Sequence, residues 1–268
     1  MTIITSRQNS IVARFREVTR SHRNNRERIL LEGLTLINDA RKANVPLEVA
    51  VFSTDESKKR SRELHTLANR LKLLGVDVIR ASNSVLEALS PAHEPSGVVA
   101  IGIHQPIALR NVFADGGLVL APIGVQDPGN VGAIIRSADA GSASGIVVTG
   151  GSADPFGWRA LRGAMGSTFR LPVVDIDNLD RVVNMARKRN ASVLAAVPKG
   201  GSSIYTIDLT GDLLVLLGNE SSGLNSQVAS YANNLITVPM RNSVNSLNTA
   251  VAASLIIYEA NRQRKDNS

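Results

Sequence analysis

The sequence predicts an α/β protein in which a small N-terminal α/β/α domain precedes a larger domain built on a mostly parallel sheet. Two observations support this fold class. Short apolar runs alternate with segments of helical periodicity along most of the chain, a pattern typical of strands covered by helices. The alternation pauses once, around Pro106, where residues 105–115 have the composition of a linker.

The first alternating series begins with a helix at residues 11–20, where Ile11, Phe15 and Val18 share one side and arginines the other. The apolar run 29–31 follows and stops at Gly33. The later elements of this series are helix 34–43, strand 47–52, helix 56–74, strand 76–79, a short helix to residue 89 capped by Ser82 or Ser84, and strand 97–103.

The second series begins with the apolar run 118–123, which is suited to a parallel strand buried on both faces. It continues with helix 131–140, strand 145–149, helix 158–165, strand 171–174, helix 179–189, strands 192–197, 213–217 and 235–238, and helix 247–262. We therefore expect a basic helical extension at 1–25, a first domain at 26–104, a linker at 105–115 and a second domain at 116–268.

Composition favours a polyanionic partner. The net charge is +7 and the sequence pI is about 10.1. Residues 1–30 contain seven arginines against two glutamates, although a solvated basic surface would explain this surplus equally well. Aromatic residues are only 3%, so stacking of bases on exposed rings is not expected to dominate binding.

Several classes of protein are disfavoured. The chain has no cysteine, which excludes disulfides, thiolate metal sites and a cysteine nucleophile. Its four histidines are scattered, so we expect no metal site. Neither a signal peptide nor an apolar run of transmembrane length is recognisable, and we expect a cytoplasmic protein without a membrane partner.

Three polar loops follow apolar strands of the second series, at the positions where ligands bind in open α/β sheets. The first runs from Asp127 to Arg136, with Asn130 as an eligible helix cap. The second is 218–224, with a carboxylate between two glycines, and the third is 238–248, with Ser246 or Asn248 as cap. Each alone is explained by a turn or a helix start, but together they predict one composite site.

At these loops the sequence resembles the SpoU/TrmH family of SPOUT RNA 2′-O-ribose methyltransferases. The three family motifs appear in order as Asn130-x-Gly-Ala-Ile-x-Arg136, Gly218-x-Glu220-x-x-Gly223-Leu224, and Val238-Pro-Met240 with Ser246-Leu-Asn248. Thr249-Ala250 stand where Val-Ser is common in the family. The segments 29–33 and 97–101 resemble the start and end of the family's N-terminal substrate-binding domain.

The resemblance implies a SPOUT domain with a C-terminal trefoil knot, a homodimer, and S-adenosylmethionine as methyl donor, released as S-adenosylhomocysteine, without a metal. The reaction site it implies consists of Asn130, Arg136, Glu220, Ser246 and Asn248. The implied cofactor-binding residues are Ala195, Ala196, Val197, Leu217, Gly218, Asn219, Gly223, Val238, Met240, Ser246 and Leu247. As RNA contacts we expect Arg23, Arg26, Arg28, Arg159 and Arg162.

Large-subunit (23S) rRNA is the favoured substrate, because an N-terminal RNA-binding domain is commoner in the ribosomal-RNA members of the family than in the tRNA members. DNA is not expected as a partner. Three alternatives stay open at this point: a tRNA 2′-O-methyltransferase, methylation of a base nitrogen, and a non-catalytic RNA-binding protein in ribosome assembly. The complete set of motif residues argues against the last.

In the family the first-motif arginine, here Arg136, is usually proposed to activate the ribose hydroxyl. A guanidinium keeps its proton in proteins, so it is a poor base. We expect Arg136 instead to bind the RNA phosphate beside the target ribose and to stabilise the developing alkoxide. Glu220 or a phosphate oxygen then accepts the proton, while Ser246 and Asn248 position the loop and the ribose.

Overall fold

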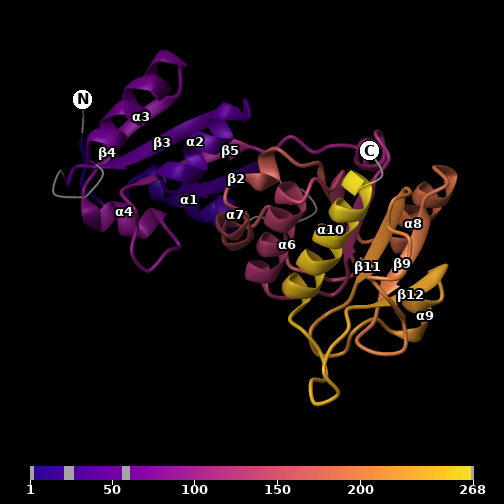
Figure 1. The fold of residues 1–268 in the computed structure, drawn as a ribbon. Coiled ribbons are helices and arrows are strands. Elements are labelled where there is room, and N and C mark those ends of the chain that lie inside the picture. The colour runs from indigo at the N-terminus through magenta and orange to yellow at the C-terminus, as the bar shows by residue number, and fades with distance from the viewer. Residues whose placement is uncertain (1–2, 21–26, 56–60, 267–268) are drawn as a thin grey trace. The chain divides into compact units, whose positions relative to one another are not determined.

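The computed structural model describes residues 3–20, 27–55 and 61–266, which form two compact units (Figure 1). Unit 1 comprises Met1–Gln105 and Phe156–Phe169, and unit 2 comprises Pro106–Pro155 and Arg170–Ser268. The α/β class and the mostly parallel sheet of the second half are confirmed. The implied knot stays a prediction.

Unit 1 is built on a five-stranded sheet with the order β1-β4-β3-β5-β2. Strand β5 runs antiparallel to β2 and β3, whereas β3, β4 and β1 pair in parallel. The strands are β1 (Ile3–Ile4), β2 (Arg28–Glu32), β3 (Leu47–Ser53), β4 (Asp77–Ala81) and β5 (Val98–Ile103). The helices are α1 (Ser10–Arg20), α2 (Leu34–Lys42), α3 (Ser61–Leu73), α4 (Asn83–Leu89) and α7 (Trp158–Ala164), with a 3-10 turn η2 (Ser167–Phe169).

Each face of this sheet has its own core. Helices α2, α3 and α7 pack on one face around Ile37, Leu67 and Leu161. Helices α1 and α4 pack on the other around Phe15 and Leu86. Helix α1, expected as a separate extension, thus belongs to the body of unit 1, because its apolar side is buried there. Residues 56–60, the start of the expected helix 56–74, lie outside the described residues.

The segment Phe156–Phe169 is the second departure from the expected division. The sequence assigned its helix to the second domain, because it stands between two strands of that domain. In the structure Leu161 is fully buried in the core of unit 1, together with residues of α2 and α3. Burial of a leucine side chain stabilises this attachment by about 1.5–3 kcal/mol.

Unit 2 contains a seven-stranded sheet with the order β10-β12-β9-β11-β6-β7-β8, in which all neighbours are parallel. Parallel strands are buried on both faces, which explains the continuous apolar runs of the sequence. The strands are β6 (Leu118–Pro122), β7 (Gly145–Val148), β8 (Val173–Asp175), β9 (Ser192–Ala196), β10 (Ser202–Ser203), β11 (Leu213–Leu217) and β12 (Asn234–Thr237).

Helices cover both faces of this sheet. Helices α5 (Leu109–Val112), α8 (Leu179–Lys188) and α9 (Ser226–Ala229) lie on the face towards which Leu214 and Leu216 point. Helices α6 (Pro128–Ala140) and α10 (Thr249–Asp266) lie side by side, as Figure 1 shows. The Ser254 hydroxyl of α10 donates to the Ser137 hydroxyl of α6 over 2.7 Å.

The expected linker 105–115 is partly folded, which corrects the prediction. Leu109, Val112 and Phe113 are buried against β7, β8 and α8 as helix α5 and its C-cap. The sequence also missed β1, β10 and α9, which are two to four residues long. A strand of two residues or a helix of a single turn is too short to show a periodic pattern of apolar residues in the sequence.

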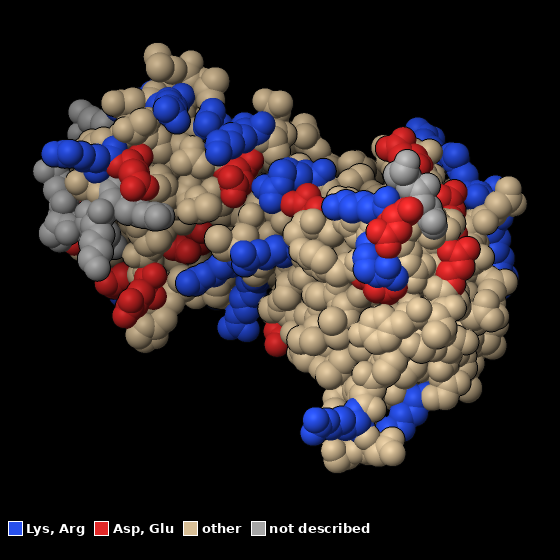
Figure 2. All heavy atoms as spheres, viewed as in Figure 1, with Lys and Arg blue, Asp and Glu red and all other residues tan. Residues whose placement is uncertain are grey.

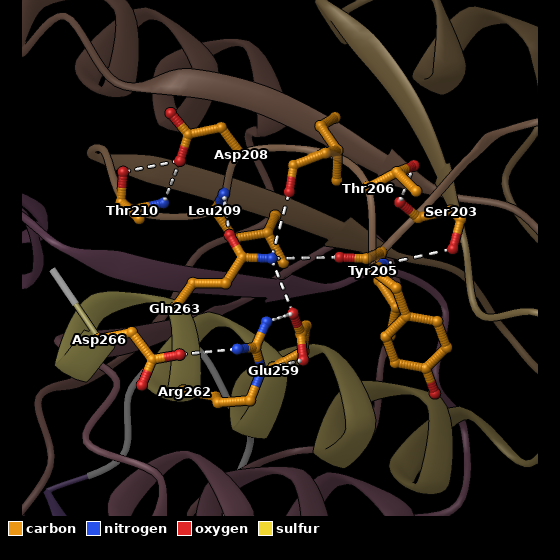
Figure 3. A network of polar contacts seen from close by, with 12 residues as sticks. Ser203, Tyr205, Thr206, Asp208, Leu209, Thr210, Glu259, Arg262, Gln263 and Asp266 are labelled. Carbon is orange, nitrogen blue, oxygen red and sulfur yellow. Dashed lines mark hydrogen bonds and ion pairs between the residues drawn. The ribbon is translucent and has the colours of Figure 1, made fainter.

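The end of α10 fixes the segment that follows β10, as Figure 3 shows. The side-chain nitrogen of Gln263 donates to the carbonyls of Ile204 (3.3 Å) and Ile207 (3.2 Å), and its oxygen accepts from the amide of Leu209 (2.8 Å). Glu259 accepts from Arg262 and, in addition, from Gln263, and these bonds lower the pKa of the Glu259 carboxyl. One glutamine therefore satisfies three main-chain groups of an otherwise irregular segment.

Candidate active site

The three polar loops meet at one edge of the unit 2 sheet. They follow β6, β11 and β12, and the carboxyl ends of these parallel strands all lie at this edge. The side-chain nitrogen of Asn130 donates to Glu220, and that of Asn248 donates to the side-chain oxygen of Asn130 over 3.1 Å. One residue from each loop thus joins a single hydrogen-bonded chain.

The Asn130 side chain is available for these hydrogen bonds because it does not cap α6, contrary to its expected role. The cap is Asp127, whose carboxylate accepts from the amide of Gly129 over 2.7 Å. Pro128 follows at the first helical position, where proline has the required backbone angle and lacks only an unused donor. Asn130 therefore lies within the first turn, with its amide group turned to the neighbouring loops.

Asn248 has two roles. Its side-chain oxygen accepts from the amides of Ala250 (2.9 Å) and Val251 (3.2 Å), which makes it the N-cap of α10. Its side-chain nitrogen is then left to reach Asn130. Of the two residues expected as eligible caps, Asn248 is the one that serves.

A cavity of about 350 Å³ opens between the second and third loops. Its volume falls in the range typical of small-molecule sites. The expected cofactor residues that line it are Ala196, Val197, Leu217, Gly218, Asn219, Gly223, Val238, Met240, Ser246 and Leu247. Ala195 does not; it is fully buried against the core beside α8, because alternate residues of a strand face opposite sides.

The second loop is folded tightly against itself. A Cβ atom on Gly218 would lie 2.5 Å from the carbonyl carbon of Gly223 and 2.6 Å from the amide nitrogen of Leu224, so only glycine fits. The side-chain oxygen of Asn219 accepts from the amides of Ser221 (2.7 Å) and Ser222 (3.0 Å). Asn219 thus shapes the loop with its side chain.

The apolar part of the cavity includes residues that the sequence analysis missed. Ile236 lies in β12, and Ala252 and Ile256 follow Thr249 along α10 at helical spacing. That spacing on the first turns of a helix after the third loop was the available signal. The Thr249 hydroxyl also donates to the Gly218 carbonyl over 2.9 Å, which ties α10 to the second loop.

The five expected reaction-site residues are not all in direct contact. Glu220 and Ser246 line the cavity, and Asn130 and Asn248 continue from Glu220. Arg136 is exposed and stands outside this hydrogen-bonded chain. It lies six residues after Asn130, about 240° around the helix axis at about 100° per residue, so the two side chains leave different sides of α6.

The arginines expected to contact RNA are distributed differently. Arg23 and Arg26 lie outside the described residues. Arg28 of β2 donates to both oxygens of Glu48, at 2.7 and 3.3 Å, and this pairing lowers the pKa of the Glu48 carboxyl. Arg159 and Arg162 are exposed on α7 of unit 1, and the Arg159 guanidinium lies 5.3 Å from the ring centre of Trp158.

The arrangement combines an apolar cavity, main-chain polar groups and the Glu220 carboxylate, which accepts a hydrogen bond from the Asn130 amide. It is suited to a flat, partly apolar ligand whose reactive end is turned towards Glu220 and Asn130. The described part of the chain contains no cluster of three or more His, Cys, Asp or Glu side chains that could hold a metal ion. Among the described helices, none has the length and apolar character needed to cross a membrane.

Residues 117–258 match the SpoU rRNA Methylase family, and residues 12–100 match an MRM3-like substrate binding domain. The chain is 33% identical to the 23S rRNA (uridine(2479)-2′-O)-methyltransferase of Streptomyces viridochromogenes, over 97% of this chain and 92% of that protein. It is 30% identical to the 23S rRNA (guanosine(2553)-2′-O)-methyltransferase RlmP of Bacillus subtilis, over 90% and 91%.

Solved structures resemble the whole chain. An rRNA methyltransferase from Sinorhizobium meliloti with bound AdoMet has a TM-score of 0.85 and 30% identity, covering 97% of both chains. The SpoU methyltransferase AviRb from Streptomyces viridochromogenes in complex with AdoMet also has a TM-score of 0.85, with 29% identity over 96% of this chain and 99% of that one. The three motif loops, the cavity between them and these matches together assign the chain to the SpoU rRNA methylase family.

Proposed function

We propose that this protein transfers a methyl group from S-adenosylmethionine to a ribose 2′-hydroxyl of 23S rRNA. The observation that carries the proposal is the cavity bounded by the second and third motif loops, with Glu220 and Ser246 on its lining and Asn130 bonded to Glu220. Both relatives described above are named as 23S rRNA 2′-O-methyltransferases, which supports the substrate class over tRNA. Action on ribosomal RNA is compatible with the expected cytoplasmic location.

The cavity fits S-adenosylmethionine in chemistry. Ile236, Leu224 and Ile256 offer apolar surface for an adenine ring, and the loops supply main-chain donors and acceptors. Gly218, Val238 and Leu247 would hold the cofactor through their backbones. When bound, the cofactor supplies a methyl group already activated on a sulfonium centre.

The residues around the cavity would then prepare the ribose. The second carboxylate oxygen of Glu220 would accept the proton of the 2′-hydroxyl, while Asn130 keeps the carboxylate in place through its bond to the first oxygen. Ser246 would position the ribose, and Asn248 would hold Asn130. Alignment of oxygen and methyl group contributes much of the rate in such a transfer.

Arg136 would bind the RNA phosphate beside the target ribose. Its side chain is exposed and pairs with no carboxylate among the described residues, so it is available to an incoming anion. A planar guanidinium binds phosphate through two parallel hydrogen bonds, whereas an ammonium acts as a point charge. An Arg136→Lys variant should therefore lose most activity, and near wild-type turnover would contradict this role.

The protein would act as a homodimer. Helix α10 exposes Val251, Leu255 and Tyr258, at 48%, 39% and 56% of their surfaces, and their spacing of four and three residues places them on one side. Ala253, Ile256 and Ile257 are buried on the inner side. An exposed row of large apolar side chains on a helix is typical of an association surface.

The proposed function is tested by incubating the purified protein with S-adenosylmethionine and unmodified 23S rRNA transcribed in vitro. Nucleosides released from the RNA are then analysed by mass spectrometry. We expect one 2′-O-methylated nucleoside, and a Glu220→Gln variant should form it far more slowly. Methylation on a base, or transfer to tRNA alone, would contradict the proposal.

A further inference from the structure

A second cavity, of about 410 Å³, lies beside the first. One wall is the segment 198–203, which follows β9 and includes β10, and the other is the segment 237–244, which begins at the end of β12. Pro198 and Met240 line both cavities, so the two are separated by a shared wall. In the proposed function, neither the cofactor nor the target ribose occupies this second cavity.

The two walls are held together by bonds within the protein. The hydroxyl of Thr237 donates to the carbonyl of Val197 and accepts from the amide of Gly201, both over 3.0 Å. A Cβ on Gly201 would lie 2.7 Å from the carbonyl carbon of Ile236, so glycine is required for this approach. The parallel pairing of β10 with β12 continues the contact. The cavity therefore exists before any ligand binds.

The lining is cationic. Lys199 and Arg241 are exposed on the two walls, and no aspartate or glutamate lines the cavity. Within the described residues, neither side chain is paired with a carboxylate. Gly200, between Lys199 and Gly201, has φ of +82° and only open space where a side chain would stand. Figure 2 shows Lys and Arg colouring, and no acidic colouring, at the tip of unit 2 where the loop before α10 lies in Figure 1.

We propose that this second cavity binds the sugar-phosphate backbone of the nucleotide that adjoins the methylated one. The inference rests on the proposed function. Each ribose in RNA is flanked by two phosphates, so a target ribose at Ser246 and Glu220 must be followed or preceded by a phosphate close by. Lys199 and Arg241 would pair with that phosphate across the wall shared at Met240.

The same cations do not suit the amino-acid end of S-adenosylmethionine. That end carries an ammonium group as well as a carboxylate, and a matching site would offer an acidic partner too. The second cavity offers two cations without an acid. A polyanionic strand is the ligand whose charge this lining complements.

The test is a Lys199→Ala/Arg241→Ala double variant. Its matched control, Lys188→Ala/Arg189→Ala, loses the same charge at the end of α8, which precedes β9 and so lies at the opposite edge of the sheet. Methyl transfer to transcribed 23S rRNA is measured at several salt concentrations, and the affinity for S-adenosylmethionine by calorimetry. A Lys199→Arg/Arg241→Lys variant keeps both charges and should recover most RNA affinity.

We expect the double alanine variant to raise KM for RNA about tenfold, with kcat and cofactor affinity little changed. The slope of log KM against log salt should fall by about 0.7, the value for one lost contact with a single-stranded phosphate. The control should change neither. An unchanged KM for RNA, or a loss of cofactor affinity of similar size, would overturn the inference. If the wild-type protein methylates no rRNA, the proposed function itself fails and the inference falls with it.

Discussion

Replacing Gly218 by alanine tests whether the tight fold of the second motif loop makes the first cavity. The added Cβ would lie 2.5 Å from the carbonyl carbon of Gly223 and 2.6 Å from the amide nitrogen of Leu224. Comfortable contact between heavy atoms needs about 3.5 Å, so one of the two segments must move by about 1 Å. Neither contact is a flexible side chain, and the main chain of 223–224 must therefore shift.

The expected cost follows from this displacement. Forcing an extra methyl group into a well-packed site lowers the free energy of unfolding by about 1–3 kcal/mol. Because Gly223 and Leu224 also line the cavity, the shift should weaken binding of S-adenosylmethionine by at least about tenfold, which corresponds to about 1.4 kcal/mol. Urea denaturation measures the first quantity and calorimetry the second.

Gly211 provides the matched control. An alanine Cβ there meets nothing within 4 Å, and its backbone is not among the left-handed glycines. A Gly211→Ala variant should be stabilised by about 0.4–1 kcal/mol, because alanine restricts the unfolded chain, and should bind the cofactor normally. If Gly218→Ala matches the wild type in stability and cofactor affinity, the packing argument for this loop is wrong.

Three further predictions concern the helix that follows the third loop. Asn248→Ala should lower the free energy of unfolding by about 1 kcal/mol through loss of the cap and should reduce methyl transfer, whereas Asn248→Asp keeps the cap but cannot donate to Asn130, so it should restore stability to urea and not activity. Equal turnover in the two variants would refute the bridging role. Leu255→Glu should abolish the proposed dimer and give a monomer in light scattering, and a dimer that persists would place the interface elsewhere. The bonds that Arg262 donates lower the folded-state pKa of Glu259 below its unfolded value. Its stabilising contribution is therefore complete above the unfolded pKa and is lost as pH falls through the folded pKa. Glu259→Gln should therefore be less stable at neutral pH but lose less stability on acidification, measured by thermal unfolding; an unchanged pH profile would contradict this.

The strand and helix pattern of the second half could be predicted because its signals are local. Strand β11 is apolar throughout, and α10 has helical spacing and an eligible cap. The capping residue of α6 was misassigned although the signal was present, since Asp127 stands directly before a proline. Asn130 is also eligible by type, because asparagine is a favoured cap wherever it stands near a helix start.

Other features depend on contacts that no local pattern encodes. Strand β9 is apolar along most of its length, so the sequence does not distinguish the face of Ala195 from that of Ala196. The helix α7 was predicted, but its packing partner is decided by where Leu161 finds a core. The second cavity could not be predicted either, because Lys199 and Arg241 are distant in sequence and meet only through the pairing of β9, β10 and β12.

The membership of Phe156–Phe169 in unit 1 limits how this chain can be recombined. A cut after Gln105 would give an N-terminal fragment without Leu161 and a C-terminal fragment carrying a helix whose apolar side has lost its core. Exchange of residues 1–105 between relatives would likewise place a foreign surface against α7. Unit 1 is therefore encoded by two separated stretches of sequence, and a chimaera that keeps its core intact should exchange both together.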